Sequence, residues 1–190
     1  MTEVLVVDDE VELAELYGSW LDGEYDVRTT HSGGEAVDEL PGSDVVLLDR
    51  RMPDISGDEV LAIARDREID CRVAMGTAVS PEFDVIEMGF DDYLVKPVSR
   101  EELLETVERL ERRSTYDEKL QRYFSLVSRR AALKREKRPE ELATSEEFHD
   151  LTDRIDALRS DLDAILDGFD DRDYSATLRD VAADAEFSRP

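Results

Sequence analysis

The stretch Val4-Leu5-Val6-Val7-Asp8-Asp9-Glu10 decides the fold, because four consecutive apolar residues end abruptly in three acidic ones. An unbroken apolar run of this length is typical of a strand that is buried on both faces of a parallel sheet. The run Val45-Val46-Leu47-Leu48 ends in the same way, at Asp49. Shorter runs over 73–75 and 93–95 have the same character. Four buried strands are therefore predicted, and the alternating segment 25–28 is expected as an edge strand.

Apolar residues recur at helical spacing between these strands. The segments are 13–21, 36–40, 60–64, a short one over about 81–88, and one that starts with a capping box formed by Ser99 and Glu102. Five strands that alternate with five helices predict an α/β fold, a doubly wound five-stranded parallel sheet with helices on both faces.

The chain is expected to divide into two domains, residues 1–112 and residues 113–190, because no strand pattern remains after residue 113. The second domain is predicted to be all-α. Its first helix is marked by Leu120, Phe124, Val127 and Ala131 and is expected to end before Pro139. The joint at 112–116 is short, so the last helix of the first domain is expected to run nearly continuously into this one.

A second helix of the C-terminal domain is predicted to start at a capping box formed by Thr144 and Glu147. Its apolar positions repeat at intervals of three and four residues: Phe148, Leu151, Ile155, Leu158, Leu162 and Ile165. This spacing favours the core of a helical hairpin, with an intermolecular coiled coil as the alternative. A shorter helix is expected from Ser175 onward.

The charge of the chain is extreme. Its 190 residues include 24 basic and 49 acidic side chains, a formal net charge of −25, and the basic residues are 20 arginines against 4 lysines. This composition is typical of a halophile protein, since at about 1 M salt the Debye length is only about 3 Å. The alternative is an acidic protein from an organism that lives at ordinary salt concentration. Nonspecific binding of nucleic acid by the whole surface is not expected.

Neither a membrane nor an oxidising compartment is expected. The sequence contains no apolar run of about 18 residues and no secretory signal pattern at its start. Cys71 is the only cysteine, which excludes an internal disulfide and is typical of a reducing environment. The expected location is therefore cytoplasmic.

Polar residues follow four of the predicted strands. Asp8 and Asp9 follow the first strand, Asp49 the third, Thr77 the fourth and Lys96 the fifth. In a doubly wound sheet, ligands bind at the carboxyl ends of the strands. Three carboxylates at one edge require a cation, and oxygen ligands beside a phosphate site favour Mg²⁺. Together with Lys96, the metal would neutralise a phosphoryl group during its transfer.

These residues resemble the receiver domain of two-component response regulators. The resemblance is carried by four motifs in order: Val6-Val7-Asp8-Asp9-Glu10, Leu47-Leu48-Asp49-Arg50-Arg51-Met52-Pro53-Asp54-Ile55-Ser56-Gly57, Gly76-Thr77-Ala78, and Asp92-Tyr93-Leu94-Val95-Lys96-Pro97. It implies a flavodoxin-like strand order of 2-1-3-4-5. It also implies a response regulator that takes part in phosphorelay signal transduction and is not an enzyme beyond autocatalysed phosphoryl acceptance and slow dephosphorylation.

The resemblance implies a role for each site residue. Asp49 would accept a phosphoryl group from a histidine kinase, and Mg²⁺ would be held by Asp8, Asp9, Asp49 and the backbone carbonyl of Arg51. Thr77 and Lys96 would bind phosphoryl oxygens, with a cis bond between Lys96 and Pro97. Thr77 and Tyr93 would form the switch, remodelling the surface of the fourth helix, fifth strand and fifth helix.

Two readings compete with this one for the first domain. A haloacid-dehalogenase-type phosphatase also uses an aspartate at a strand end, but its usual motif places aspartates two residues apart, whereas Asp8 and Asp9 are adjacent. A stand-alone receiver that only shuttles phosphate, with a purely structural tail, is the other alternative. His31 and His149 have no companion ligands in the sequence and are assigned no chemistry.

The second domain resembles the HalX domain of haloarchaeal regulators in its helix pattern, its acidity and its position after a receiver. Within it, residues 129–138 carry six basic residues and one acidic residue. This segment is interpreted either as a contact for DNA or an acidic partner, or as a segment paired within the chain with the acidic faces around 150–163 or of the first domain. Signalling through protein contacts is favoured, with a DNA-binding transcriptional regulator as the alternative. Candidate homodimer surfaces are the C-terminal helices and the face of the fourth helix, fifth strand and fifth helix.

Overall fold

The computed structural model describes residues 1–78 and 89–169. It divides into two compact units, Met1–Ser114 and Thr115–Pro190. The strands are β1 (Glu3–Val7), β2 (Asp26–Thr30), β3 (Val45–Asp49), β4 (Arg72–Thr77) and β5 (Asp92–Val95). The helices are α1 (Val11–Leu21), α2 (Gly33–Glu39), α3 (Gly57–Asp66), α4 (Arg100–Glu136), α5 (Pro139–Ala143) and α6 (Glu146–Leu166). The helices predicted over about 81–88 and from Ser175 lie outside the described residues.

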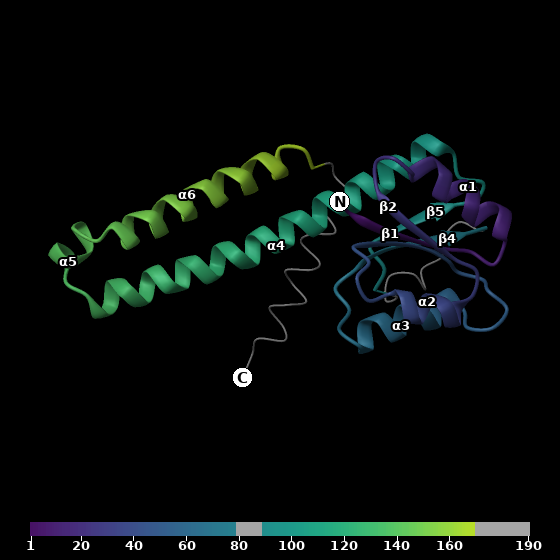
Figure 1. Ribbon diagram of the computed structural model, residues 1–190, viewed down its shortest axis with the longest axis horizontal. Helices are drawn as coiled ribbons and strands as arrows, with labels where there is room; N and C mark the ends of the chain where they lie inside the picture. Colours follow the sequence, from purple (N-terminus) through teal and green to yellow (C-terminus); the bar gives the residue numbers. More distant parts are fainter. Residues whose placement is uncertain (79–88, 170–190) are drawn as a thin grey trace. The chain divides into compact units, whose positions relative to one another are not determined.

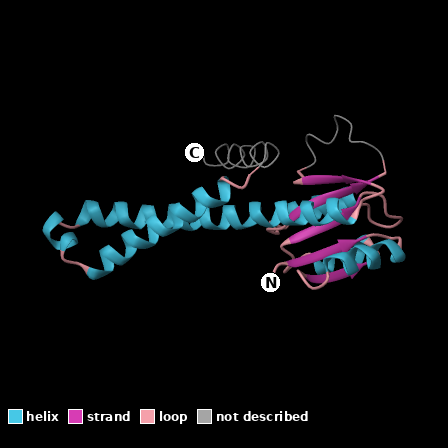
Figure 2. Ribbon diagram, turned by 90° about the horizontal axis from the view of Figure 1, so that it is seen from above, coloured by secondary structure: helices cyan, strands magenta, loops and turns pink. Residues whose placement is uncertain are grey.

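The five strands form one parallel sheet in the order β2-β1-β3-β4-β5, which confirms the predicted fold class (Figures 1 and 2). β1 lies between β2 and β3, with Val4 in register with Val27 on one side and Val45 on the other. The carboxyl ends of β1, β3 and β5 consequently lie at the same edge of the sheet. β2 is an edge strand, as its alternating sequence predicts. The prediction of a buried strand over 93–95 is wrong: β5 is the other edge strand and only Leu94 in it is buried, because no further strand of the described residues pairs with its outer side.

Alternate residues of the buried strands divide the core into two layers. One face of the sheet, with Val4, Val6 and Leu47, packs against α1 and the first turns of α4. The other face, with Leu5 and Leu48, packs against α2 and α3. Successive residues of a strand point to opposite faces of the sheet. A strand that helices cover on both faces therefore needs an unbroken apolar run.

α4 runs without a break from Arg100 to Glu136, which confirms the expected continuity across the joint. Its start is stabilised by the hydroxyl of Ser99, which accepts a hydrogen bond from the backbone N–H of Glu102 at 3.2 Å. The helix therefore contributes its first turns to one unit and its last turns to the other.

In the second unit, α4 and α6 lie side by side as a hairpin joined by α5. Lys119 of α4 donates to Asp161 of α6 at 2.5 Å, and the rings of Tyr116 and Phe169 lie 5.5 Å apart. The predicted capping box is wrong by one residue. Ser145 is the N-cap of α6 and accepts from the N–H of Phe148, while the hydroxyl of Thr144 bonds to backbone carbonyls of α5.

Two of the six apolar positions of α6, Ile155 and Leu162, are buried. The predicted hairpin core therefore forms, but it is narrow. Within the described ranges, no helix is both long enough and apolar enough to span a bilayer.

Candidate functional site

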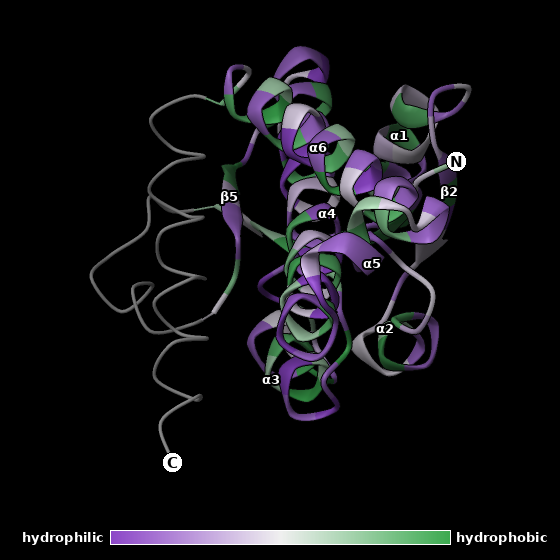
Figure 3. Cartoon of the chain, turned by 90° about the vertical axis from the view of Figure 1, so that its left-hand side faces the viewer, coloured by the Kyte–Doolittle hydropathy of each residue, from purple (hydrophilic) through white to green (hydrophobic). Residues whose placement is uncertain are grey.

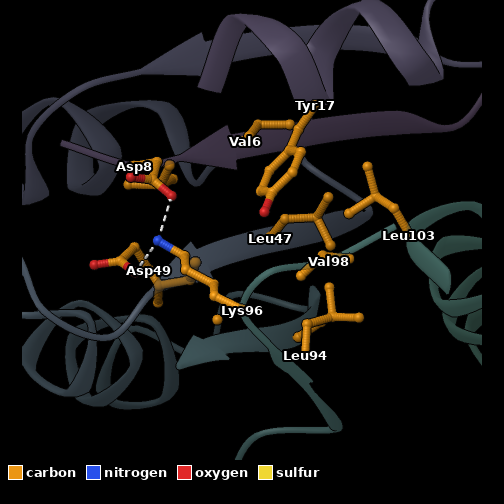
Figure 4. A pocket seen from close by; sticks show the side chains of 13 residues that line it. Val6, Asp8, Tyr17, Leu47, Asp49, Leu94, Lys96, Val98 and Leu103 are labelled. Atoms are coloured by element: carbon orange, nitrogen blue, oxygen red, sulfur yellow. Dashed lines mark hydrogen bonds and ion pairs between the residues drawn. The ribbon is translucent and has the colours of Figure 1, made fainter. Parts of the chain in front are cut away.

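Three of the predicted site residues meet at the carboxyl edge of the sheet (Figure 4). The ammonium of Lys96 donates to Oδ2 of Asp8 at 2.7 Å and to Oδ1 of Asp49 at 2.5 Å. The side chains of Asp8 and Asp49 are 3% and 8% exposed, so both carboxylates are almost removed from water. Buried charges are tolerated only when they are paired, and Lys96 supplies the pairing for both.

The local backbone holds each carboxylate in place. Oδ1 of Asp8 accepts from the backbone N–H of Glu10 at 3.1 Å, just before α1 begins. Oδ2 of Asp49 accepts from the backbone N–H of Arg51 at 2.8 Å. Each carboxylate thus uses one oxygen for its own loop and the other for Lys96, which fixes its orientation.

Burial raises the pKa of Asp49, and the hydrogen bond from Lys96 opposes this rise without cancelling it. For Lys96, burial lowers the pKa, but hydrogen bonds to Asp49 and Asp8 outweigh it and leave the pKa raised. The lysine is therefore held as a cation, while the aspartate is more basic than an exposed one. A more basic carboxylate is a better nucleophile once it is deprotonated.

The remaining strand ends frame this group. The Lys96–Pro97 bond is cis, as predicted, and the backbone N–H of Lys96 donates to the carbonyl of Thr77 at 2.8 Å. Thr77 is the last residue of β4 and lies in register with Val95. Tyr93, the other residue of the predicted switch, is 41% exposed.

The carboxylate oxygen atoms at this edge of the sheet are suitable ligands for a hard cation, but the three predicted carboxylates do not form one group. Asp9 is exposed, and the described residues contain no group of three His, Cys, Asp or Glu side chains that could hold a metal. Asp8 and Asp49 share the ammonium of Lys96, whose single positive charge offsets one of their two negative charges. Mg²⁺ is commonly bound through one or two carboxylates plus waters and phosphate, so the donor set remains suitable.

A cavity lies behind the ion pairs, between the sheet and the helices α1 and α4 (Figure 4). Its polar side is formed by Asp8, Asp49 and Lys96, and its apolar side includes Leu47 and Leu94. Gly76 lines it as well: a Cβ built there would lie 3.6 Å from Cε of Lys96, an ordinary contact. The small residue before Thr77 therefore leaves free space beside the lysine.

Sequence reasoning assigned no role to two residues of this site. A Cβ on Gly57 would lie only 2.2 Å from the carbonyl oxygen of Asp49, so only glycine fits over the strand end. Tyr17 lines the cavity, and the burial of its ring raises the pKa of its hydroxyl. Gly57 closes the second quoted motif, so its place beside Asp49 was the available signal. The helical spacing around Tyr17 gave no signal that this residue would line the cavity.

Comparison with protein families gives two adjacent matches. Residues 4–108 match the response regulator receiver domain, and residues 112–178 match the HalX domain.

Individual relatives agree with these matches. A Haloferax volcanii protein whose name calls it a candidate transcriptional regulator is 50% identical over 165 residues, which cover 86% of this chain and 28% of that protein. The response regulator SaeR of Staphylococcus epidermidis is 36% identical over 109 residues, covering 55% of this chain and 48% of SaeR. The chain thus spans between about a quarter and a half of the length of these relatives.

Solved structures resemble the first unit. The Thermotoga maritima response regulator TrrA, in complex with Mg²⁺ and a beryllium fluoride, is 37% identical, with a TM-score of 0.53, over 58% of this chain and 99% of TrrA. The Vibrio cholerae chemotaxis protein CheY4 is 30% identical, with a TM-score of 0.54, over 58% of this chain and 98% of CheY4.

Proposed function

Because this chain belongs to the response regulator receiver family and continues into a HalX domain, we propose that it is a phosphoryl-activated response regulator. Asp49 would accept a phosphoryl group from a histidine kinase in the cytoplasm, and the helical unit would pass the signal on through protein contacts. The observation that carries this proposal is the placement of Lys96 between the buried carboxylates Asp8 and Asp49.

The chemistry follows from these side chains. An oxygen of Asp49 would form a bond to phosphorus as the phosphorus–nitrogen bond of the phosphohistidine breaks, and the leaving imidazole would take the electron pair and a proton. Lys96, already a cation within 2.5 Å of Asp49, would neutralise the added negative charge. The hydroxyl of Thr77 would donate to a phosphoryl oxygen.

Asp8, Asp49, the carbonyl of Arg51 and the exposed Asp9 would hold Mg²⁺ beside the phosphoryl group, where it would supply charge neutralisation. The related TrrA structure contains Mg²⁺ together with a beryllium fluoride, which supports this choice of ion. The chain would turn over no further substrate: phosphoryl acceptance and its slow hydrolysis would be its only reactions.

The proposal is tested by incubating the full chain with acetyl phosphate and Mg²⁺ and following its mass. The wild type is expected to gain one phosphoryl group, and Asp49→Ala none. Asp54→Ala, at an exposed position in the same loop, is the matched control and should label like the wild type. Equal labelling of Asp49→Ala would overturn the assignment of the acceptor, and labelling that persists after chelation with EDTA would overturn the role of Mg²⁺.

A further inference from the structure

The helical hairpin, made of α4 from Thr115 onward, α5 and α6, leaves much apolar surface uncovered. Only four of its described hydrophobic side chains are buried: Leu126, Ile155, Leu162 and Phe169. Phe124 is 58% exposed and Leu133 is 37% exposed. Stable helical architectures bury each apolar stripe against another element, which two helices alone cannot do on all sides. A further surface is needed to cover this hairpin.

The basic segment 129–138 lies on this hairpin and makes almost no ion pairs. Residues 131–138 are all exposed. The one ion pair that the described residues give this segment joins Arg138 to Glu141 at 3.8 Å, within the turn between the helices. The predicted alternative of pairing with the acidic helix of the same chain is therefore not realised in the described residues, and the charge of +5 stays available.

α6 carries the complementary charge. Between Glu146 and Leu166 it has seven acidic residues and two arginines, a net charge of −5, equal and opposite to that of segment 129–138. Of these acids, Asp161 alone is joined to α4, through Lys119. Glu146 and Asp150 are exposed and have no ion-pair partner among the described residues.

The two charge sets lie at the same end of the hairpin. The contact of Lys119 with Asp161 sets the level of the antiparallel helices, and each step forward on α4 corresponds to one step back on α6. Lys134, fifteen residues after Lys119, is thus level with Glu146, fifteen residues before Asp161. Figure 3 shows that both hydrophilic and hydrophobic residues occur along α4 and α6.

We propose that the occupant of this surface is the hairpin of a second copy of the chain. Two hairpins that point the same way, related by a twofold axis along their length, would place α4 of each copy against α6 of the other. Such an interface is isologous, so both basic segments meet both acidic helices at once. Phe124, which lies on the side of α4 opposite Leu133, can be buried in this interface. The result is a four-helix arrangement with a fuller core than either hairpin has alone.

DNA fits this surface less well. The acidic residues of α6 lie level with the basic segment and would repel phosphates, and binding through phosphate contacts weakens steeply as salt rises. Contact ion pairs within a dimer are short and partly buried, and salt screens such pairs much less than it screens exposed charges.

The test is sedimentation equilibrium of the full chain in molar KCl. The wild type is expected at twice its chain mass of 21.6 kDa. Lys134→Glu/Arg135→Glu and Glu146→Lys/Asp150→Lys should each raise the dimer dissociation constant by about tenfold or more, because every interface then meets like charges. An equimolar mixture of these two variants should restore the dimer, since both interfaces of the heterodimer regain opposite charges.

Glu12→Lys/Glu15→Lys, on the exposed side of α1, makes the same change in charge as Glu146→Lys/Asp150→Lys but outside the hairpin, and should leave the dissociation constant unchanged. Phe124→Glu is an independent variant outside both charge sets and should also weaken the dimer. Circular dichroism checks that each variant keeps its helix.

A wild type that stays monomeric would overturn the proposal and favour cover by residues 170–190 of the same chain. A mixture that stays monomeric would overturn the charge pairing. Salt-resistant binding of a DNA duplex that competes with self-association would instead assign the surface to nucleic acid.

Discussion

Nζ of Lys96 lies 2.5 Å from Oδ1 of Asp49, although β4 separates the strands that deliver these two residues. The lysine stem crosses β4 at Gly76, where a built Cβ would lie 3.6 Å from its Cε. A Cβ there would make only ordinary van der Waals contact, so the lysine stem passes over β4 without a steric clash. The contact joins the proposed phosphoacceptor to the end of the strand that bears Tyr93.

Replacing Lys96 by methionine should destabilise the chain, because Asp8 and Asp49 would remain buried without a cation. The free energy of unfolding should fall by about 3 kcal/mol at neutral pH, the usual cost of breaking a buried ion pair. Urea unfolding in molar KCl measures it. Lys96→Arg keeps the charge and should lose less. A loss as small as that of an exposed pair, below about 1 kcal/mol, would contradict the buried pairing.

Gly57→Ala should distort the phosphoacceptor strand, because the new methyl group would lie 2.2 Å from the carbonyl oxygen of Asp49. We expect a loss of about 2 kcal/mol or more in unfolding free energy and slower labelling by acetyl phosphate. Gly34→Ala is the matched control: it also lies in the first turn of a helix, but its Cβ would meet nothing within 4 Å. The control should be neutral or slightly stabilising, and equal behaviour of both variants would refute the steric argument.

Asp91 gathers three arginines at the opposite edge of the sheet. Its carboxylate, 6% exposed, accepts from Arg65 at 3.1 Å, Arg72 at 2.7 Å and Arg113 at 3.4 Å. Asp91→Ala would leave these cations without their shared anion, so we expect unfolding free energy to fall by about 3–5 kcal/mol. Chemical denaturation followed by circular dichroism provides the measurement.

An exposed ion pair on α4, the helix that carries Arg113, supplies the control for this prediction. Glu108 and Arg112 lie 2.9 Å apart at i,i+4 and are 61% and 36% exposed. Glu108→Ala should cost about 0.5 kcal/mol or less. A similarly small loss of unfolding free energy for Asp91→Ala would show that its ion pairs stabilise the chain no more than an exposed pair does.

Tyr25 should make stability depend on alkaline pH. Burial, and then the nearby carboxylates of Glu111 and Glu108, raise its pKa from 10.0 to about 12. Because the folded-state pKa is the higher one, the stabilisation is complete below pH 10 and is lost as pH rises toward 12. The wild type should lose about 2 kcal/mol more than Tyr25→Phe across this window in urea titrations. Parallel curves for both proteins would contradict the shift.

The order of strands and helices could be predicted from the sequence because its signals are local. Apolar runs, helical spacing and the hydroxyl of Ser99 act over a few residues, and the structure bears them out. Local signals also have a limited precision: the cap of α6 is Ser145 rather than Thr144, since either hydroxyl could precede the same apolar face. The capping residue was settled by which hydroxyl reached a free N–H.

By itself, the sequence determined a doubly wound parallel sheet whose strand ends carry Asp8, Asp49, Thr77 and Lys96, because periodicity and strand-end placement are local properties of the sequence. Only the tertiary structure decided that Lys96 would pair with both buried carboxylates while Asp9 stays exposed. It also decided that segment 129–138 would make, among residues 1–78 and 89–169, a single ion pair, from Arg138 to Glu141. These pairings depend on the distances in space between segments that are far apart in the sequence. A buried charge must be paired, and the packing decides which opposite charge lies close enough.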